Sequence, residues 1–111
     1  MEHHSSFDRI RKKLIEQAKA GEVIEYNHFI YGGYGVARGD GQPWKIGNVL
    51  GDICRYEKEN GRPLLGAICV LKATGMPSIG FWGFFNTNYE DPVKWEKERD
   101  RVFRYWQTHD S

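Results

Sequence analysis

The sequence is poor in the residues that make metal or cofactor chemistry easy to recognise. It contains two cysteines and four histidines in 111 residues. Neither Cys54 nor Cys69 belongs to a C-x-x-C or Cys/His pair with zinc-site spacing, so we expect no metal and no cofactor. Both cysteines lie in apolar patterns, where free cysteines act as small hydrophobic residues. In a reducing compartment they form no disulfide.

Long apolar runs and signal-peptide features are also missing. No stretch approaches the roughly 20 residues that span a bilayer, and residues 1–6 are polar, without a hydrophobic leader core. We therefore expect a cytoplasmic protein without membrane partners. The composition, 40% hydrophobic and 28% charged, is that of a globular chain. The length predicts one domain over residues 1–111, with residues 1–5 disordered.

An excess of one charge is absent as well, because 16 basic and 15 acidic residues leave a net charge of +1. The total charge therefore does not drive association with nucleic acid. If DNA binds, the basic residues must gather on one face of the folded chain.

A recognisable catalytic constellation is missing too. Only His28 lies inside the periodic part of the sequence, beside aromatic residues, where a structural role is more common than catalysis. Acids such as Glu57 and Glu59 lie on helix faces, and no pattern brings several acids to one pocket, as a metal-dependent nuclease requires. The sequence favours a non-catalytic protein, with a small nuclease-like enzyme as an alternative.

What is present is a set of periodic segments. Apolar spacing predicts helices over residues 5–20 and 43–59, and a last helix that begins at Asp91-Pro92 with an acidic N-cap. Between the first two we expect a short strand at Val23-Ile24 and a short helix over residues 26–31. The 43–59 helix has the clearest apolar stripe, formed by Ile46, Val49, Leu50, Ile53 and Cys54.

Two glycines stand four positions apart in this helix, at Gly47 and Gly51. Glycine lowers helix stability relative to alanine. We therefore expect something to offset this cost, and the close approach of another backbone would do so. That backbone belongs either to a packed helix or to a nucleic acid.

Gly32–Gln42 is predicted to be a loop, because five of its eleven residues are glycine. It matches neither the P-loop nor the dinucleotide-binding motif. The loop is either a mobile connector or a segment that a partner orders through Tyr34 and Arg38.

A strand pair follows the 43–59 helix. Gly61 ends that helix, and Pro63 directs the chain into an extended path. Residues 64–71 and 79–85 are predicted strands, joined by turn residues 72–78 into a β-hairpin. Helices followed by a hairpin and a C-terminal helix give an α+β fold of winged-helix type. That architecture places the helix before the hairpin, and the hairpin tip, against a duplex.

Four stretches resemble the winged-helix domain of DNA alkyltransferases and alkyltransferase-like proteins. They are Ile24-Glu25-Tyr26 at the opening, Trp44–Gly47 in the helix motif, Gly61–Leu65 at the strand entry and Gly75–Gly80 in the wing. The resemblance covers about half of the chain and implies a DNA-binding domain.

The sequence departs from that family at its reactive positions. The family nucleophile lies in Pro-Cys-His-Arg, whereas Cys69 has neither neighbour, so we expect no alkyl transfer. Trp44 stands where the family has an intercalating arginine. The pattern GRPLL…TGMP…GF is also similar to small uncharacterised prokaryotic proteins, some of which accompany nuclease or defence modules. That likeness implies a recognition domain of prokaryotic or phage type.

We therefore predict a nucleic-acid-binding domain, with duplex DNA as its partner. The alternative is a protein-interaction module or inhibitor in a defence or mobile-element system. The predicted nucleic-acid contacts are Trp44, Lys45, Asn48, Arg55, Arg62, Lys72 and Thr74, and the predicted loop contacts are Tyr34 and Arg38.

Overall fold

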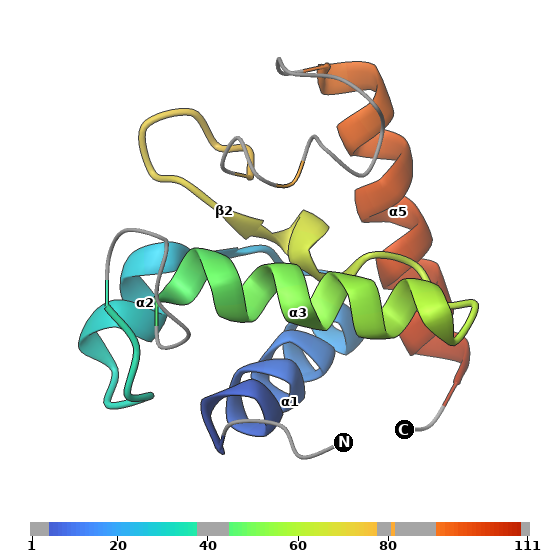
Figure 1. Ribbon diagram of the computed structural model, residues 1–111. Coiled ribbons are helices and arrows are strands. Elements are labelled where there is room, and N and C mark those ends of the chain that lie inside the picture. Colours follow the sequence, from blue (N-terminus) through green and yellow to red (C-terminus); the bar gives the residue numbers. More distant parts are fainter. Residues whose placement is uncertain (1–4, 38–44, 78–80, 82–90, 110–111) are drawn as a thin grey trace.

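The computed structural model describes residues 5–37, 45–77, 81 and 91–109. Its elements in chain order are α1 (Ser5–Ala20), β1 (Ile24–Glu25), α2 (Tyr26–Tyr31), α3 (Ile46–Glu59), the 3-10 helix η1 (Leu65–Ile68), β2 (Cys69–Val70) and α5 (Pro92–Thr108). In Figure 1, α3 crosses the front of the molecule, α1 lies beneath it and α5 stands along one side. The described part is a mixed α+β fold in which helix predominates.

The core lies where the three long helices meet η1. Each of α1, α3 and α5 is amphipathic and contacts η1 with its apolar face. Burial of each Leu or Ile side chain stabilises the fold by about 1.5–3 kcal/mol. The side chains without exposed surface include Ile10, Leu14, Phe29, Ile53, Leu65, Ile68 and Val102.

The sheet is parallel and has two strands among the described residues. Ile24 of β1 pairs with Cys69 of β2, and Glu25 pairs with Val70. Parallel strands need a crossover connection, and here α2, α3 and η1 lie between the two strands in the sequence. The predicted short strand before α2 is present, shifted by one residue, and α2 has the predicted bounds.

The strand predicted over residues 64–71 is wrong for most of its length. Residues Leu65–Ile68 form one 3-10 turn, and only Cys69–Val70 form a strand. The turn buries four consecutive residues in the space between three helices, and a single strand face cannot do this. The predicted second strand, residues 79–85, lies outside the described residues apart from Phe81, which is buried.

The helix ends follow the sequence signals closely. α1 begins at Ser5, so this residue belongs to a helix and not to a disordered N-terminus, while residues 1–4 lie outside the described part. Asp91 caps α5, and its carboxylate accepts the backbone N–H groups of Val93 and Lys94 at 3.2 Å. α3 begins at Ile46, three residues later than predicted.

A Schellman motif ends α3. The Gly61 N–H donates to the Lys58 carbonyl at 3.1 Å, and the Arg62 N–H donates to the Glu57 carbonyl at 2.9 Å. Gly61 has a φ of 72°, in the left-handed region that favours glycine. The chain therefore turns sharply after Asn60 and continues into η1.

Candidate nucleic-acid interface

The start of α3 is held by the end of the glycine-rich loop. Lys45 occupies the N-cap position, and its backbone pairs with Ala37 in an isolated parallel bridge. The Ile46 N–H donates to the Ala37 carbonyl at 2.9 Å, so one of the free N–H groups at the helix start is satisfied by backbone. Arg38 and Trp44, two of the predicted contacts, lie outside the described residues.

The predicted contact residues of α3 differ in exposure. Lys45 and Asn48 are half-buried, whereas Arg55 is exposed. Arg55 pairs with Asp52 one turn earlier, and both side chains are more than half exposed. An exposed pair of this kind contributes at most about 1 kcal/mol. To contact an external phosphate, Arg55 would have to break this weak ion pair with Asp52.

The two glycines of α3 were expected to mark the close approach of another backbone. A Cβ built on Gly51 meets only the guanidinium of Arg55, at 3.6–4.0 Å, and no backbone of another element. The helix-packing interpretation is therefore wrong for Gly51. The guanidinium of Arg55, at the end of a flexible side chain, lies at van der Waals distance from this position.

The predicted wing turn is a closed structure over residues 71–76. The Leu71 N–H donates to the Met76 carbonyl at 2.9 Å, and the Gly75 N–H donates to the Leu71 carbonyl at 2.8 Å. The Thr74 hydroxyl accepts the Met76 N–H at 3.2 Å. Gly75 has a φ of 70°. Thr74 therefore shapes the turn, while the neighbouring Lys72 is exposed at its tip.

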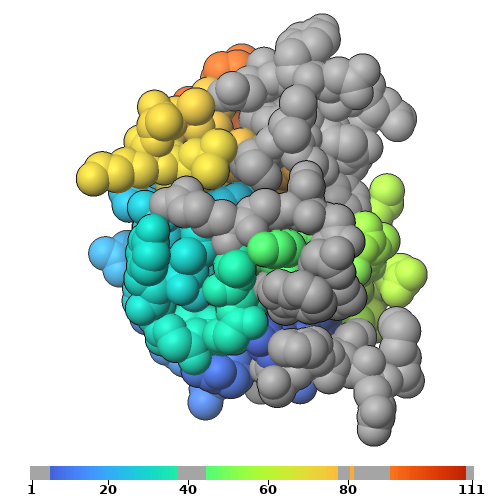
Figure 2. All heavy atoms as spheres, turned by 60° about the vertical axis from the view of Figure 1, so that its left-hand side comes forward, coloured from blue at the N-terminus to red at the C-terminus, as the bar shows by residue number. Residues whose placement is uncertain are grey.

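The 71–76 turn and the start of α3 share one side of the molecule. Figure 2 shows the turn in yellow, α2 and the loop after it in teal, and the first turn of α3 in green, all on one face. Figure 1 places the same three segments at the N-terminal end of α3. We call the surface formed by the 71–76 turn and the first turn of α3 the α3–turn face.

The loop after α2 is anchored to α1 through Tyr34. The Ser6 hydroxyl donates to the Tyr34 carbonyl at 2.6 Å, and the Arg9 guanidinium donates to the Gly33 carbonyl at 2.9 Å. The same guanidinium lies 5.0 Å from the Tyr34 ring centroid. These contacts order residues 32–35 without an outside partner, so the described part of the loop is not a free connector.

His28 contacts aromatic groups rather than acids. Its Nε2 atom lies 3.4 Å from the Tyr34 hydroxyl, and its ring meets Phe29 edge to face. A His–Tyr contact without an acid or nucleophile beside it is not a catalytic dyad. The described residues also bring together no set of three or more His, Cys, Asp or Glu side chains that suits a metal ion.

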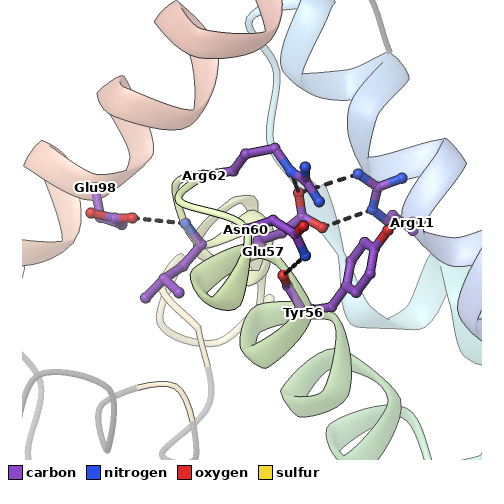
Figure 3. A network of polar contacts seen from close by, with 7 residues as sticks. Arg11, Tyr56, Glu57, Asn60, Arg62 and Glu98 are labelled. Carbon is purple, nitrogen blue, oxygen red and sulfur yellow. Dashed lines mark hydrogen bonds and ion pairs between the residues drawn. The ribbon is translucent and has the colours of Figure 1, made fainter. Parts of the chain in front are cut away.

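Arg62 lies away from the α3–turn face, in an ion cluster at the other end of α3 (Figure 3). Glu57 has no exposed surface and accepts from Arg62 Nε at 2.7 Å and from Arg11 Nε at 2.8 Å. The hydrogen bond that Arg62 donates to Glu57 raises the pKa of Arg62 further above its ordinary value. Both guanidinium groups also lie against the ring of Tyr56. Glu57 therefore links Arg11 of α1 to Arg62, which follows the end of α3.

The GRPLL segment owes its position to α5. The buried Glu98 carboxylate accepts the Leu64 N–H at 2.8 Å and binds Arg101 Nη1 at 2.6 Å. The Trp95 indole N–H donates to the Ala67 carbonyl at 2.8 Å. Both backbone groups lie in an irregular buried segment and would otherwise lack partners in the sheet. This explains why a late W-x-x-E pattern accompanies GRPLL in the sequence.

The two cysteines are core residues. Burial raises the pKa of Cys54 to about 12 and holds the pKa of Cys69 well above its ordinary value. A nucleophilic thiolate needs a lowered pKa and access to its substrate, and both thiols have the opposite environment. Cys54 Sγ would lie 2.6 Å from a Cβ at Gly66, so this glycine lets η1 approach α3.

Two of these structural roles escaped the sequence reasoning. Glu57 was treated as one acid of a solvated helix face, although it follows Ile53 by four residues and Cys54 by three on the buried stripe. That position was the signal for a buried carboxylate. Its partner Arg11 lies 46 residues away, and no local pattern connects the two.

None of the described helices has the length and apolar character needed to cross a bilayer.

Comparisons with protein-family models, curated proteins and solved structures find no match for this chain.

Proposed function

We propose that the protein binds nucleic acid, with duplex DNA as its partner, and that the α3–turn face is its recognition surface. The observation that carries the proposal is the closed turn at residues 71–76, which contains the exposed Lys72 and lies on the same side of the molecule as the start of α3. A turn fixed by its own hydrogen bonds loses little conformational entropy when it meets a partner. In this proposal the protein is a non-catalytic recognition domain of winged-helix type.

The residues of this face take different roles. Lys45 and Lys72 contact phosphates, which positions the domain on the duplex. Asn48, one turn into α3, has the donor and acceptor pattern that reads an adenine edge in the major groove. Arg55 joins them by releasing Asp52, and Thr74 acts by keeping the turn closed. Arg62 makes no contact in this scheme, because Glu57 holds it.

A titration of a fluorescently labelled duplex at 50 and 200 mM salt tests the proposal. We expect binding that weakens steeply with salt, because bound lysines and arginines release counterions from the phosphates. The double variant Lys45→Gln/Lys72→Gln should bind more weakly and with a smaller salt dependence. The matched control Lys58→Gln/Lys19→Gln removes two exposed lysines elsewhere and should retain the affinity. Wild-type protein that binds no duplex at 50 mM salt excludes the proposal.

A protein-docking function is the second candidate. Tyr31 of α2 is 74% exposed and Val23 beside β1 is 41% exposed, so the α2 side offers large apolar side chains to a partner. α3 also holds two basic and three acidic residues, a mixture that suits a protein surface as well as a phosphate backbone. One stoichiometric protein that co-purifies with the wild type, but not with Tyr31→Ala, would favour this function if no duplex is bound.

A further inference from the structure

One acid stands among the contact residues proposed on α3. Asn48, Asp52 and Arg55 follow one another at spacings of four and three residues, so they lie along one strip of the helix, opposite its buried stripe. Lys45 lies three residues before Asn48 and begins the strip. Asp52 is the one acid of the sequence between Lys45 and Arg55. A carboxylate on a surface that meets phosphates is unfavourable by itself, so Asp52 needs an explanation.

In the free protein Asp52 is the ion-pair partner of Arg55. The carboxylate accepts from the guanidinium one helical turn later, and the two side chains are 55% and 60% exposed. Glu59, four residues after Arg55, makes no ion pair with it in the part of the chain that the structure describes. The negative charge of Asp52 is therefore balanced by Arg55 as long as no partner is bound.

A phosphate that takes Arg55 changes the surroundings of Asp52. The guanidinium leaves the carboxylate, and Arg55 is the one basic residue within three or four positions of Asp52. In the proposed binding mode the strip lies in the major groove, so the carboxylate then faces the duplex without its counter-ion. An unpaired charge at an interface is strongly unfavourable. The bound state therefore needs a new hydrogen-bond donor for Asp52.

The major groove offers such donors on two bases. Cytosine presents its N4 amino group, and adenine presents its N6 amino group beside the N7 acceptor. Guanine presents the N7 and O6 acceptors and thymine the O4 acceptor, all of which repel a carboxylate. The adenine N7 atom repels the second carboxylate oxygen, whereas an amide such as that of Asn48 matches both adenine groups. Cytosine is therefore the base that suits Asp52 best.

We propose that Asp52 is a specificity-determining residue of the protein and accepts a hydrogen bond from the amino group of a cytosine. The inference rests on the proposed function for the site and the class of partner, and it adds a base preference. Asp52 lies four residues after Asn48, or about 6 Å along the helix at about 1.5 Å per residue. The cytosine should therefore lie within about two base pairs of the adenine that Asn48 reads, at a rise of about 3.4 Å per pair. The same carboxylate disfavours duplexes that offer it no donor.

Selection from a pool of labelled duplexes with a random centre of about ten base pairs tests the inference. Wild-type protein selects at 50 mM salt, and the selected duplex is then titrated beside duplexes in which the C·G pair is replaced by each other pair. Asp52→Asn removes the carboxylate with little change of shape. Glu59→Gln removes the same charge from another exposed position of α3 and is the matched control. Thermal unfolding first shows that both variants are folded.

We expect the wild type to enrich a cytosine, and replacement of that base pair to weaken binding about tenfold. Asp52→Asn should prefer adenine at the same position, because an amide pairs with the N6 and N7 groups. This variant should also bind the unselected pool more tightly than the wild type, because the repulsion of phosphates is lost. Glu59→Gln should keep the preference for cytosine to within about twofold.

The inference and the proposed function fail in different ways. Wild-type protein that binds duplexes without a preference for cytosine overturns the inference and leaves the proposed function in place. So does an Asp52→Asn variant that keeps the wild-type preference, including one that binds every duplex more tightly by the same factor. Wild-type protein that binds no duplex at 50 mM salt excludes the proposed function, and the inference with it.

Discussion

At the scale of single residues, buried charge decides the geometry around α3. Glu57 is fully buried, and two arginines from different parts of the chain bind its two oxygens. The cluster links α1 to the corner where α3 ends and η1 begins. A buried ion pair of this kind adds little net stability over an apolar substitute, but removal of one partner leaves an uncompensated charge.

The variant Glu57→Gln should therefore be strongly destabilised. We expect a decrease of about 2–4 kcal/mol in the free energy of unfolding, because Arg11 and Arg62 lose their common carboxylate while most of each side chain stays buried. Urea denaturation followed by circular dichroism measures this change. Glu59→Gln, at an exposed position of the same helix, is the control and should change stability by less than about 0.5 kcal/mol. Equal, small effects would show that the cluster does not hold these elements together.

The effects of substitutions at Gly66 and Cys54 on the free energy of unfolding should be coupled. Gly66→Ala introduces a Cβ 2.6 Å from the Cys54 sulfur, so we expect a loss of about 1–3 kcal/mol from overpacking. In a Cys54→Ala background the sulfur is gone, and the same substitution should cost less. A double-mutant cycle from denaturation curves measures the difference, which we expect to be at least about 0.5 kcal/mol. Additive effects would contradict this contact.

At the scale of elements, substitutions at two glycines separate the effect of helix propensity from the effect of turn geometry. Gly51 lies inside α3 with only Arg55 near it, whereas Gly61 stands after the helix with a φ of 72°. Gly51→Ala should therefore raise the free energy of unfolding by about 0.5–1 kcal/mol. Gly61→Ala should lower it by about 1–2 kcal/mol, because an L-residue is strained in that conformation.

Thermal or urea unfolding of both variants checks whether Gly51→Ala raises the free energy of unfolding and Gly61→Ala lowers it. A destabilised Gly51→Ala protein would reveal a close contact that the structure does not contain. If Gly51→Ala is more stable but binds duplex more weakly, the nucleic acid contacts the surface of α3 around Gly51.

The elements were predictable to different degrees from the sequence. The amphipathic stripes of α1 and α3, and the Asp91-Pro92 start of α5, are local signals, and the structure follows them closely. The 3-10 turn at η1 was missed because an apolar run such as Leu64–Leu71 fits a strand and a buried turn equally well. The packing of three helices around this segment and the close approach of Cys54 to Gly66 favour the buried turn over a strand. The local sequence shows neither of these contacts.

At the scale of the whole molecule, the net charge of +1 gives no overall attraction to nucleic acid. Binding to a duplex therefore requires basic residues that gather on one face. The nucleic-acid contacts predicted at Lys45, Asn48, Arg55, Lys72 and Thr74 stay predictions, because no local pattern reveals which face collects phosphates.

The salt dependence of duplex binding by the wild-type protein is the most direct test of nucleic-acid recognition. If Lys45, Arg55 and Lys72 all contact phosphates, a plot of log Kobs against log salt concentration should have a slope of roughly −3, since each contact contributes about −0.9. A slope near zero, or no binding at 50 mM salt, would contradict nucleic-acid binding by this protein.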